Sequence, residues 1–185
     1  MNIKKIITII LIMVSVLTGC GKSDSDKVKD NSQVTQENHG RVEEETVETL
    51  VAKFNTEVVD NSSLNPASTD YLTESNNEYW YGLIEGIYLV AVPKKYTGDK
   101  AADIVNYTLL YVNKTGEYES DVASYVKHLI KANNNQITDS EIDTLLKEAK
   151  TKPNSGEAAN NGKGISIGYT ENEEKYQYQV LRLYK

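Results

Sequence analysis

The stretch EYWYGLIEGIYLVAV, residues 78–92, decides the fold class of this chain. It is rich in tyrosine, isoleucine and valine, and such aromatic and β-branched residues are typical of strands. The pair Glu85-Gly86 interrupts it. Two interpretations stay open: a hairpin turn between two strands, or a bend within one long strand. Pro93 ends the segment in either case.

Further strands are predicted on the C-terminal side of this stretch. Residues 104–112 alternate between apolar and mainly polar side chains, which is typical of a half-buried strand. Residues 165–169 place Ile165, Ile167 and Tyr169 on one face. Residues 176–184 carry apolar side chains on both faces, which indicates a central strand of a sheet.

Three amphipathic helices complete the pattern. The first, at residues 43–59, has apolar residues at helical spacing: Val47, Leu50, Val51, Phe54 and Val58. The second carries the stripe Val122, Tyr125, Val126, Leu129 and Ile130. The third begins with the capping box Thr138-Asp139-Ser140-Glu141 and ends before Pro153.

The predicted order of elements is therefore α-β-β-(β)-α-α-β-β. Strands occur in blocks joined by short turns, without the strict alternation of strand and helix that builds a parallel sheet. The sequence predicts an α+β fold, with an antiparallel sheet of four or five strands and helices packed on one face.

Composition excludes several classes of function. The chain has 185 residues and a formal net charge of −7, and it contains no basic run, so we expect no nucleic-acid partner. Its two histidines, His39 and His128, are far apart in the sequence. We expect His128 to be a surface or boundary residue, and we expect no metal site and no cofactor.

The N-terminus has the pattern of a targeting segment. Lys4 and Lys5 precede an apolar run at residues 6–17, which as a helix would rise about 18 Å, too short for a hydrocarbon core about 30 Å thick. This favours a secretory signal peptide over a retained N-terminal anchor.

The end of this run, Leu17-Thr18-Gly19-Cys20, resembles the lipobox of bacterial lipoproteins. The resemblance implies cleavage between Gly19 and Cys20 and attachment of lipid to Cys20, the single cysteine of the chain. It implies a location on the outer face of the cytoplasmic membrane, held there by the lipid. The body resembles, in general style, uncharacterised cell-envelope lipoproteins of low-GC Gram-positive bacteria.

This interpretation divides the chain into three parts. Residues 1–19 form the signal peptide, and residues 20–41 form the lipidated cysteine and a flexible tether. The tether is predicted because residues 21–41 contain almost no apolar side chains. Residues 42–185 form a single α+β extracytoplasmic domain.

One cluster of side chains suggests recognition of a partner. Tyr79, Trp80 and Tyr81 lie in one predicted strand, and Tyr176 and Tyr178 lie in another. On an uncovered sheet face these rings would form a flat platform for sugar rings or a peptide. The alternative is that they form the core, with tyrosine in place of phenylalanine.

No catalytic motif is found, so we expect a non-enzymatic binding domain for an envelope protein or glycan. One alternative is a cell-wall hydrolase that works through carboxylates such as Glu85 or Asp103. Another is an inhibitor or accessory subunit that docks by its sheet face.

Overall fold

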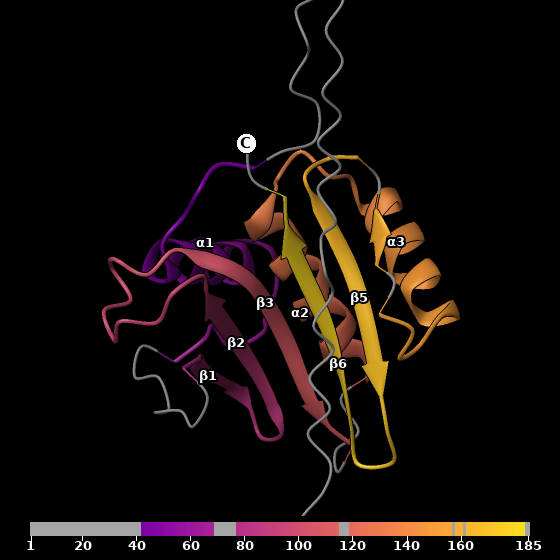
Figure 1. Ribbon diagram of the computed structural model, residues 1–185. Coiled ribbons are helices and arrows are strands. Elements are labelled where there is room, and N and C mark those ends of the chain that lie inside the picture. Colours follow the sequence, from indigo (N-terminus) through magenta and orange to yellow (C-terminus); the bar gives the residue numbers. More distant parts are fainter. Residues whose placement is uncertain (1–41, 69–76, 115–118, 157, 161, 184–185) are drawn as a thin grey trace, which may run out of the picture. The chain divides into compact units, whose positions relative to one another are not determined.

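The computed structural model describes residues 42–68, 77–114, 119–156, 158–160 and 162–183, all of which belong to one compact unit (Figure 1). The predicted signal peptide, lipobox and tether lie outside the described residues. Within the described ranges, no helix combines the length and the apolar character needed to cross a membrane.

The stretch at residues 78–92 forms a hairpin. Its strands are β1 (Tyr79–Ile84) and β2 (Ile87–Pro93), which pair antiparallel with Ile84 opposite Ile87. Gly86 lies between them with a φ of 82°, in the left-handed region that glycine adopts without steric cost. Of the two interpretations left open by the sequence, the turn between two strands is therefore the observed one.

Four more strands extend the sheet: β3 (Val105–Asn113), β4 (Ala159–Asn160), β5 (Ile165–Glu171) and β6 (Lys175–Arg182). Their order in space is β1-β2-β3-β6-β5-β4, and every pairing is antiparallel. The α+β class and the antiparallel sheet are confirmed. The expected four or five strands and the expected order of elements are wrong, since β4 adds a sixth strand between α3 and β5. It is two residues long and lies in a glycine- and asparagine-rich segment that shows no alternation.

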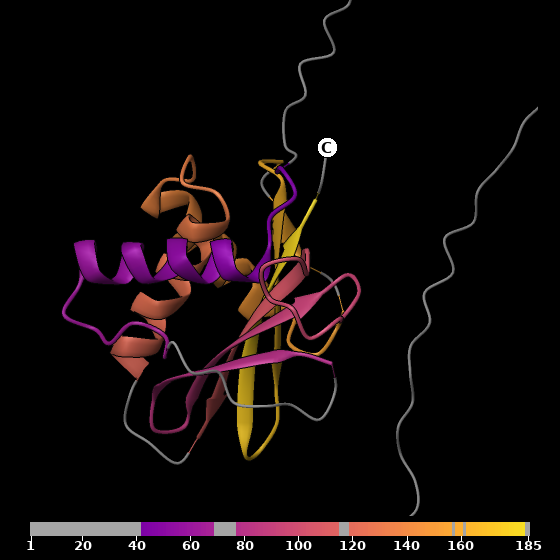
Figure 2. The same cartoon turned by 90° about the vertical axis from the view of Figure 1, so that its left-hand side faces the viewer.

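The described helices are α1 (Val47–Asn61), α2 (Glu119–Asn133) and α3 (Asp139–Thr151), and they lie on one side of the sheet (Figure 2). Helix α1 begins later than the predicted 43–59, because the Thr46 side chain caps it by accepting a hydrogen bond from the Thr49 N–H at 3.2 Å. The predicted capping box of α3 is present at Thr138 and Glu141.

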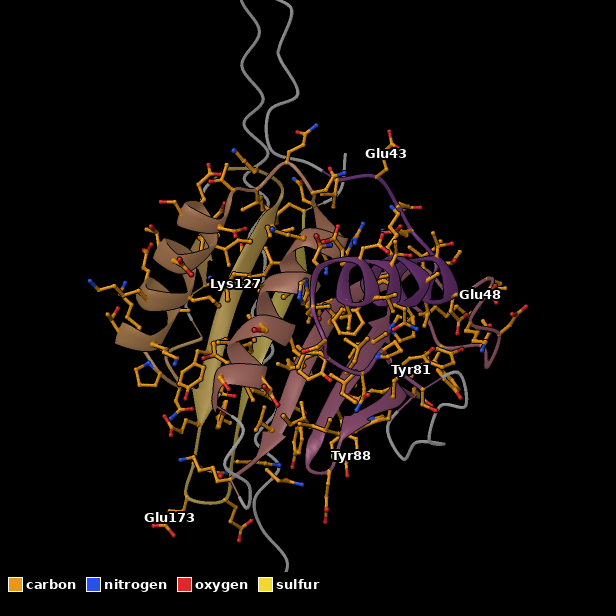
Figure 3. The ribbon with its side chains drawn as sticks, turned by 180° about the vertical axis from the view of Figure 1, so that it is seen from behind. Glu43, Glu48, Tyr81, Tyr88, Lys127 and Glu173 are labelled. Carbon is orange, nitrogen blue, oxygen red and sulfur yellow. The ribbon has the colours of Figure 1, made fainter. Side chains whose placement is uncertain are left out.

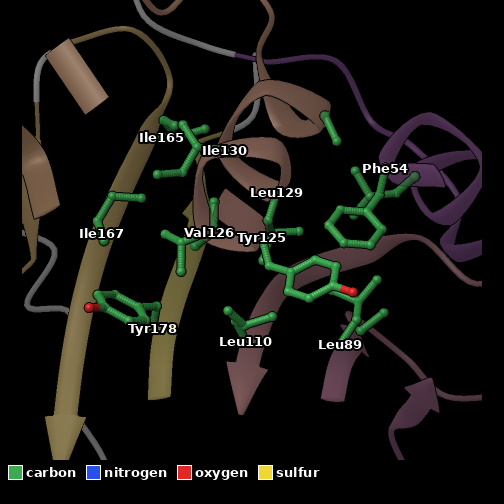
Figure 4. Packing of buried hydrophobic residues seen from close by; sticks show 14 of the residues in the cluster. Phe54, Leu89, Leu110, Tyr125, Val126, Leu129, Ile130, Ile165, Ile167 and Tyr178 are labelled. Carbon is green, nitrogen blue, oxygen red and sulfur yellow. The ribbon is translucent and has the colours of Figure 1, made fainter. Parts of the chain in front are cut away.

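The core lies between the helices and the sheet. Figure 4 shows Tyr125 of α2 between Phe54 of α1 and the strand residues Leu89 and Leu110, and each of these four exposes at most 1% of its surface. Figure 3 shows this side of the molecule, with the charged side chains of Glu43, Glu48 and Glu173 pointing away from the protein. The helices therefore bury one face of the sheet, and the opposite face is the surface of functional interest.

Candidate functional site

The side chains of the strands divide between two faces. Because successive residues of a strand point to opposite sides, the buried residues Tyr81, Leu89, Leu110 and Tyr178 mark the face that packs against the helices. We call the other side the open face, since no described helix or strand packs on it. It carries these residues of β1, β2, β3 and β6: Trp80, Gly82, Tyr88, Val90, Val92, Tyr107, Leu109, Tyr111, Asn113, Lys175, Gln177, Gln179 and Leu181.

The five aromatic residues predicted as a platform do not share a face. Tyr79 and Tyr81 are 0% and 1% exposed in the core, and Tyr178 is buried there as well. Tyr176 is partly buried against the same core, and only Trp80 lies on the open face. The expectation of one exposed platform is wrong for these residues, because consecutive positions of a strand cannot point to the same side.

Three aromatic rings from three adjacent strands meet on the open face. Trp80 of β1 lies 5.8 Å from Tyr88 of β2 and 5.3 Å from Tyr111 of β3, measured between ring centroids, and the two tyrosine rings are 6.3 Å apart. The planes of each pair are inclined by 60–62°, the edge-to-face arrangement that aromatic pairs prefer. We call Trp80, Tyr88 and Tyr111 the aromatic triad; all three are partly exposed.

Neighbouring groups hold the triad in place. The indole N–H of Trp80 donates a hydrogen bond to Glu78 Oε2 at 3.0 Å, which fixes the orientation of the ring. The ammonium nitrogen of Lys175 lies 5.0 Å from the centre of the Tyr111 ring, within the range of a cation–π interaction. Val90 and Leu109 share this face and are buried. The orientation of the triad is thus fixed before a ligand binds, and the triad shares its face with these two buried aliphatic side chains.

Gly82 leaves free space beside the triad. This glycine lies opposite Tyr88 on the hairpin, two residues beyond Trp80. A Cβ atom built on Gly82 would meet no heavy atom of the described structure within 4 Å outside its chain neighbours. The missing side chain therefore leaves room beside two of the three rings.

The open face is almost uncharged. The chain contains 27 acidic and 20 basic residues, yet Lys175 is the one charged residue among the described strand positions on this face. Glu78, which directly precedes β1, adds one carboxylate beside Trp80. The neighbouring positions on β6 are the amides Gln177 and Gln179. Gln177 lies directly opposite Tyr111, so neutral hydrogen-bonding groups adjoin the aromatic rings.

A second concave surface, of about 900 Å³, lies where α1, the end of α2 and the end of β6 meet. Its most buried charged groups bind one another. Arg182 pairs with Glu45 at 3.2 Å and donates to Asn133 Oδ1 at 2.7 Å, while Glu45 also forms an ion pair with Lys53 at 2.5 Å. These contacts tie β6, α2 and α1 together, so we assign this cluster to stability rather than to a ligand.

The carboxylates named for hydrolysis have other surroundings. Asp103 is 1% exposed and accepts hydrogen bonds from the Tyr79 hydroxyl at 2.6 Å and from the Thr97 N–H and hydroxyl at 2.8 and 2.5 Å. Burial raises the pKa of Asp103, but the hydrogen bonds from Thr97 and Tyr79 outweigh it and hold the pKa below its usual value. Glu85 is exposed in the hairpin turn. Asp103 therefore orders the loop that contains Thr97.

His128 differs from the sequence expectation. It is 8% exposed, so it is a buried residue and not a surface one, and its Nδ1 atom has no hydrogen-bond partner in the described structure. Burial is the main cause that lowers its pKa. In the described part of the chain, no three His, Cys, Asp or Glu side chains are grouped so that they could hold a metal ion.

Comparison of the chain with models of protein families, with curated proteins and with solved structures found no match. The sequence alone does not reveal the aromatic triad, because its members come from three strands. The alternation at residues 104–112 separates Tyr107 and Tyr111 from Thr108 and Leu110, but it favours burial of the side that holds the tyrosines. In the structure Thr108 and Leu110 are buried and both tyrosines are partly exposed.

Proposed function

We propose that this chain is a lipid-anchored lipoprotein on the outer face of the cytoplasmic membrane, whose folded domain binds an envelope component through the open face. The domain is a binding module and not an enzyme. The observation that carries the proposal is the aromatic triad, which is partly exposed on an almost uncharged sheet face. Partly exposed clusters of large aromatic side chains are typical of interaction sites.

The anchor part of the proposal depends on Cys20 within the segment Leu17-Thr18-Gly19-Cys20. Its test is metabolic labelling of producing cells with a palmitate analogue, comparing the natural chain with Cys20→Ala. Label is expected on the natural chain and not on the variant. Equal label on both proteins would refute the lipid anchor.

The hydrogen bonds that the buried Asp103 carboxylate accepts favour a binding function over hydrolysis. Both oxygens of Asp103 already accept hydrogen bonds from Tyr79 and Thr97, so this group has little capacity left for a substrate or a water molecule. The triad, in contrast, presents ring surface that no described helix covers. A docking role as an accessory subunit would use the same surface.

The binding part is tested by site-specific photo-crosslinking on intact cells. A benzophenone amino acid replaces Gln177, which lies opposite Tyr111 on the open face. The matched control carries it at Lys147, an exposed position on α3. A discrete product is expected from Gln177 alone. The same products from both positions, or none from Gln177, would refute the assignment of binding to this face.

A further inference from the structure

We propose that the open face binds an uncharged saccharide chain, whose sugar rings stack on the aromatic triad of Trp80, Tyr88 and Tyr111. This inference rests on the proposed function, because it names the class of ligand for the same surface. It is carried by three properties of the face: its rings, its lack of charge and its amides.

The aromatic triad supplies the stacking surface. Sugar rings present C–H groups on their flat sides, and the negative face of an aromatic ring attracts such groups. The hydrogen bond from the Trp80 indole to Glu78 orients the largest ring before a ligand arrives. The free space beside Gly82 lets a bulky, non-planar ring approach Trp80 and Tyr88. Preorganisation of this kind lowers the entropic cost of binding.

The low charge of the open face disfavours the binding of cationic and anionic polymers. Partners with high charge are recognised by side chains of the opposite charge. A cationic partner would need carboxylates on this face, and the one that adjoins the triad, Glu78, already accepts a hydrogen bond from the Trp80 indole. An anionic polymer would meet Lys175 alone, on a chain whose formal net charge is −7. A neutral chain fits a face with one cation and one carboxylate, Lys175 and Glu78, at its aromatic triad.

The amides of β6 supply hydrogen bonds for sugar hydroxyl groups. Gln177 lies opposite Tyr111 and Gln179 lies opposite the buried Leu109, so the two amides of β6 adjoin the triad on the side of Tyr111. Each amide both donates and accepts hydrogen bonds, as a hydroxyl group does. The triad on β1, β2 and β3 and the amides on β6 together cover four neighbouring strands, which is about 14 Å at the usual strand spacing. That distance suits several linked sugars better than one.

The single tryptophan of the chain makes the test direct, because Trp80 is both a triad member and the only indole reporter. The lipidated protein is purified in a detergent without a sugar headgroup and titrated with chitohexaose or cellohexaose. We expect a saturable change in tryptophan emission with at least one of these neutral hexasaccharides. We expect no change with polygalacturonate, an anionic polysaccharide.

Variants locate the binding surface. Tyr88→Ala and Tyr111→Ala keep the Trp80 reporter, and each is expected to weaken binding about tenfold, which corresponds to about 1.4 kcal/mol. The control is Tyr96→Ala, a partly exposed tyrosine that packs on Tyr79 away from the triad. It is expected to leave the affinity within about twofold, with thermal unfolding confirming that every variant is folded.

Four results would overturn the saccharide proposal. The first is no response to either neutral hexasaccharide. The second is unchanged affinity in both triad variants. The third is stronger binding of polygalacturonate than of the neutral probes. The fourth is concentration-dependent dimerisation that Tyr88→Ala abolishes, because a second copy would then occupy the face. If Gln177 still crosslinks to a protein in cells, the proposed function survives; if it crosslinks to nothing, both proposals fail.

Discussion

The hydroxyl group of Tyr79 donates a hydrogen bond of 2.6 Å to Oδ2 of Asp103, and neither residue exposes more than 1% of its surface. The bond joins β1 to the loop before β3, 24 residues further along the chain. Thr97 donates two more hydrogen bonds to the same carboxylate. One buried anion therefore connects the first strand of the sheet to the loop that leads into the third.

Removing this hydroxyl group is expected to destabilise the fold. Tyr79→Phe should lower the free energy of unfolding by about 2 kcal/mol, because the buried carboxylate loses a charge-assisted hydrogen bond. Urea denaturation at neutral pH measures the loss. Tyr88→Phe, which removes a hydroxyl group from the open face, should change stability by less than about 0.5 kcal/mol. Equal losses in both variants would contradict the special role of Asp103.

The ion pair between Glu45 and Arg182 is expected to contribute strongly to stability. Their side chains are 6% and 2% exposed, so removing the charge of Glu45 leaves a buried guanidinium group without its anion. Glu45→Gln should cost about 3 kcal/mol. The neighbouring Glu44 forms an exposed pair with Lys94, and Glu44→Gln should cost less than about 1 kcal/mol. Similar losses would show that the buried pair is not special.

We expect the free energy of unfolding to fall in acid because of the buried His128. Its pKa in the folded protein is lowered, mainly by burial, so the unfolded chain binds its proton at a higher pH than the folded one. Stability from the neutral imidazole is thus complete above the ordinary pKa of 6.5 and declines as the pH falls below it. Glu57 of α1 and Asp139 of α3 act against this shift, and Lys131 of α2 strengthens it.

The matched experiment compares the natural chain with His128→Leu by urea denaturation at pH 7 and pH 5. The natural chain should lose more stability over this interval than the variant does. A parallel decline in both proteins would show that other groups cause the pH dependence.

Asn154 is expected to protect the edge of β5. Its side chain donates to the Glu171 carbonyl oxygen and accepts from the Glu171 N–H, both at 2.9 Å, where β4 is too short to pair. Its φ of 61° is unfavourable for alanine. Asn154→Ala should lose about 2 kcal/mol, and Asn154→Gly about half of that, because glycine accepts this backbone conformation.

The same two variants should aggregate faster than the natural chain after dilution from urea, since an unpaired strand edge promotes intermolecular pairing. Light scattering during refolding measures this rate. If both variants refold as cleanly as the natural chain, the protective role of Asn154 is wrong.

The periodic elements were predictable from the sequence because a single side-chain pattern specifies each of them. Helix α3 is the clearest example, since its capping box and apolar stripe are local signals. The hairpin at Glu85-Gly86 was not decided by local pattern, because its antiparallel pairing and the register of β2 on β3 depend on contacts across strands. Strand β4 has two residues and exists only through its pairing with β5.

The candidate site was less predictable than the fold. The sequence suggests Trp80 as a binding residue, but its partners Tyr88 and Tyr111 meet it only through the register of three strands. Tyr79 and Tyr81 were grouped with Trp80 by closeness in sequence, whereas the alternation of the strand sends them to the core. Tyrosine is also ambiguous by nature, since its ring suits a core and its hydroxyl group suits a surface.

The segment before α1 determines where a mechanical load would enter the domain. The N–H of Val42 donates to the Leu183 carbonyl oxygen at 2.8 Å, and the N–H of Val105 donates to the Glu45 carbonyl oxygen at 2.9 Å. If Cys20 is anchored as proposed, a pull from the membrane reaches the C-terminal end of β6 and the first residue of β3. Trp80 and Tyr88 belong to strands outside this load path, whereas Tyr111, Gln177 and Gln179 belong to the two strands that receive the load. Tension at the anchor would therefore act on one half of the surface that we assign to the ligand.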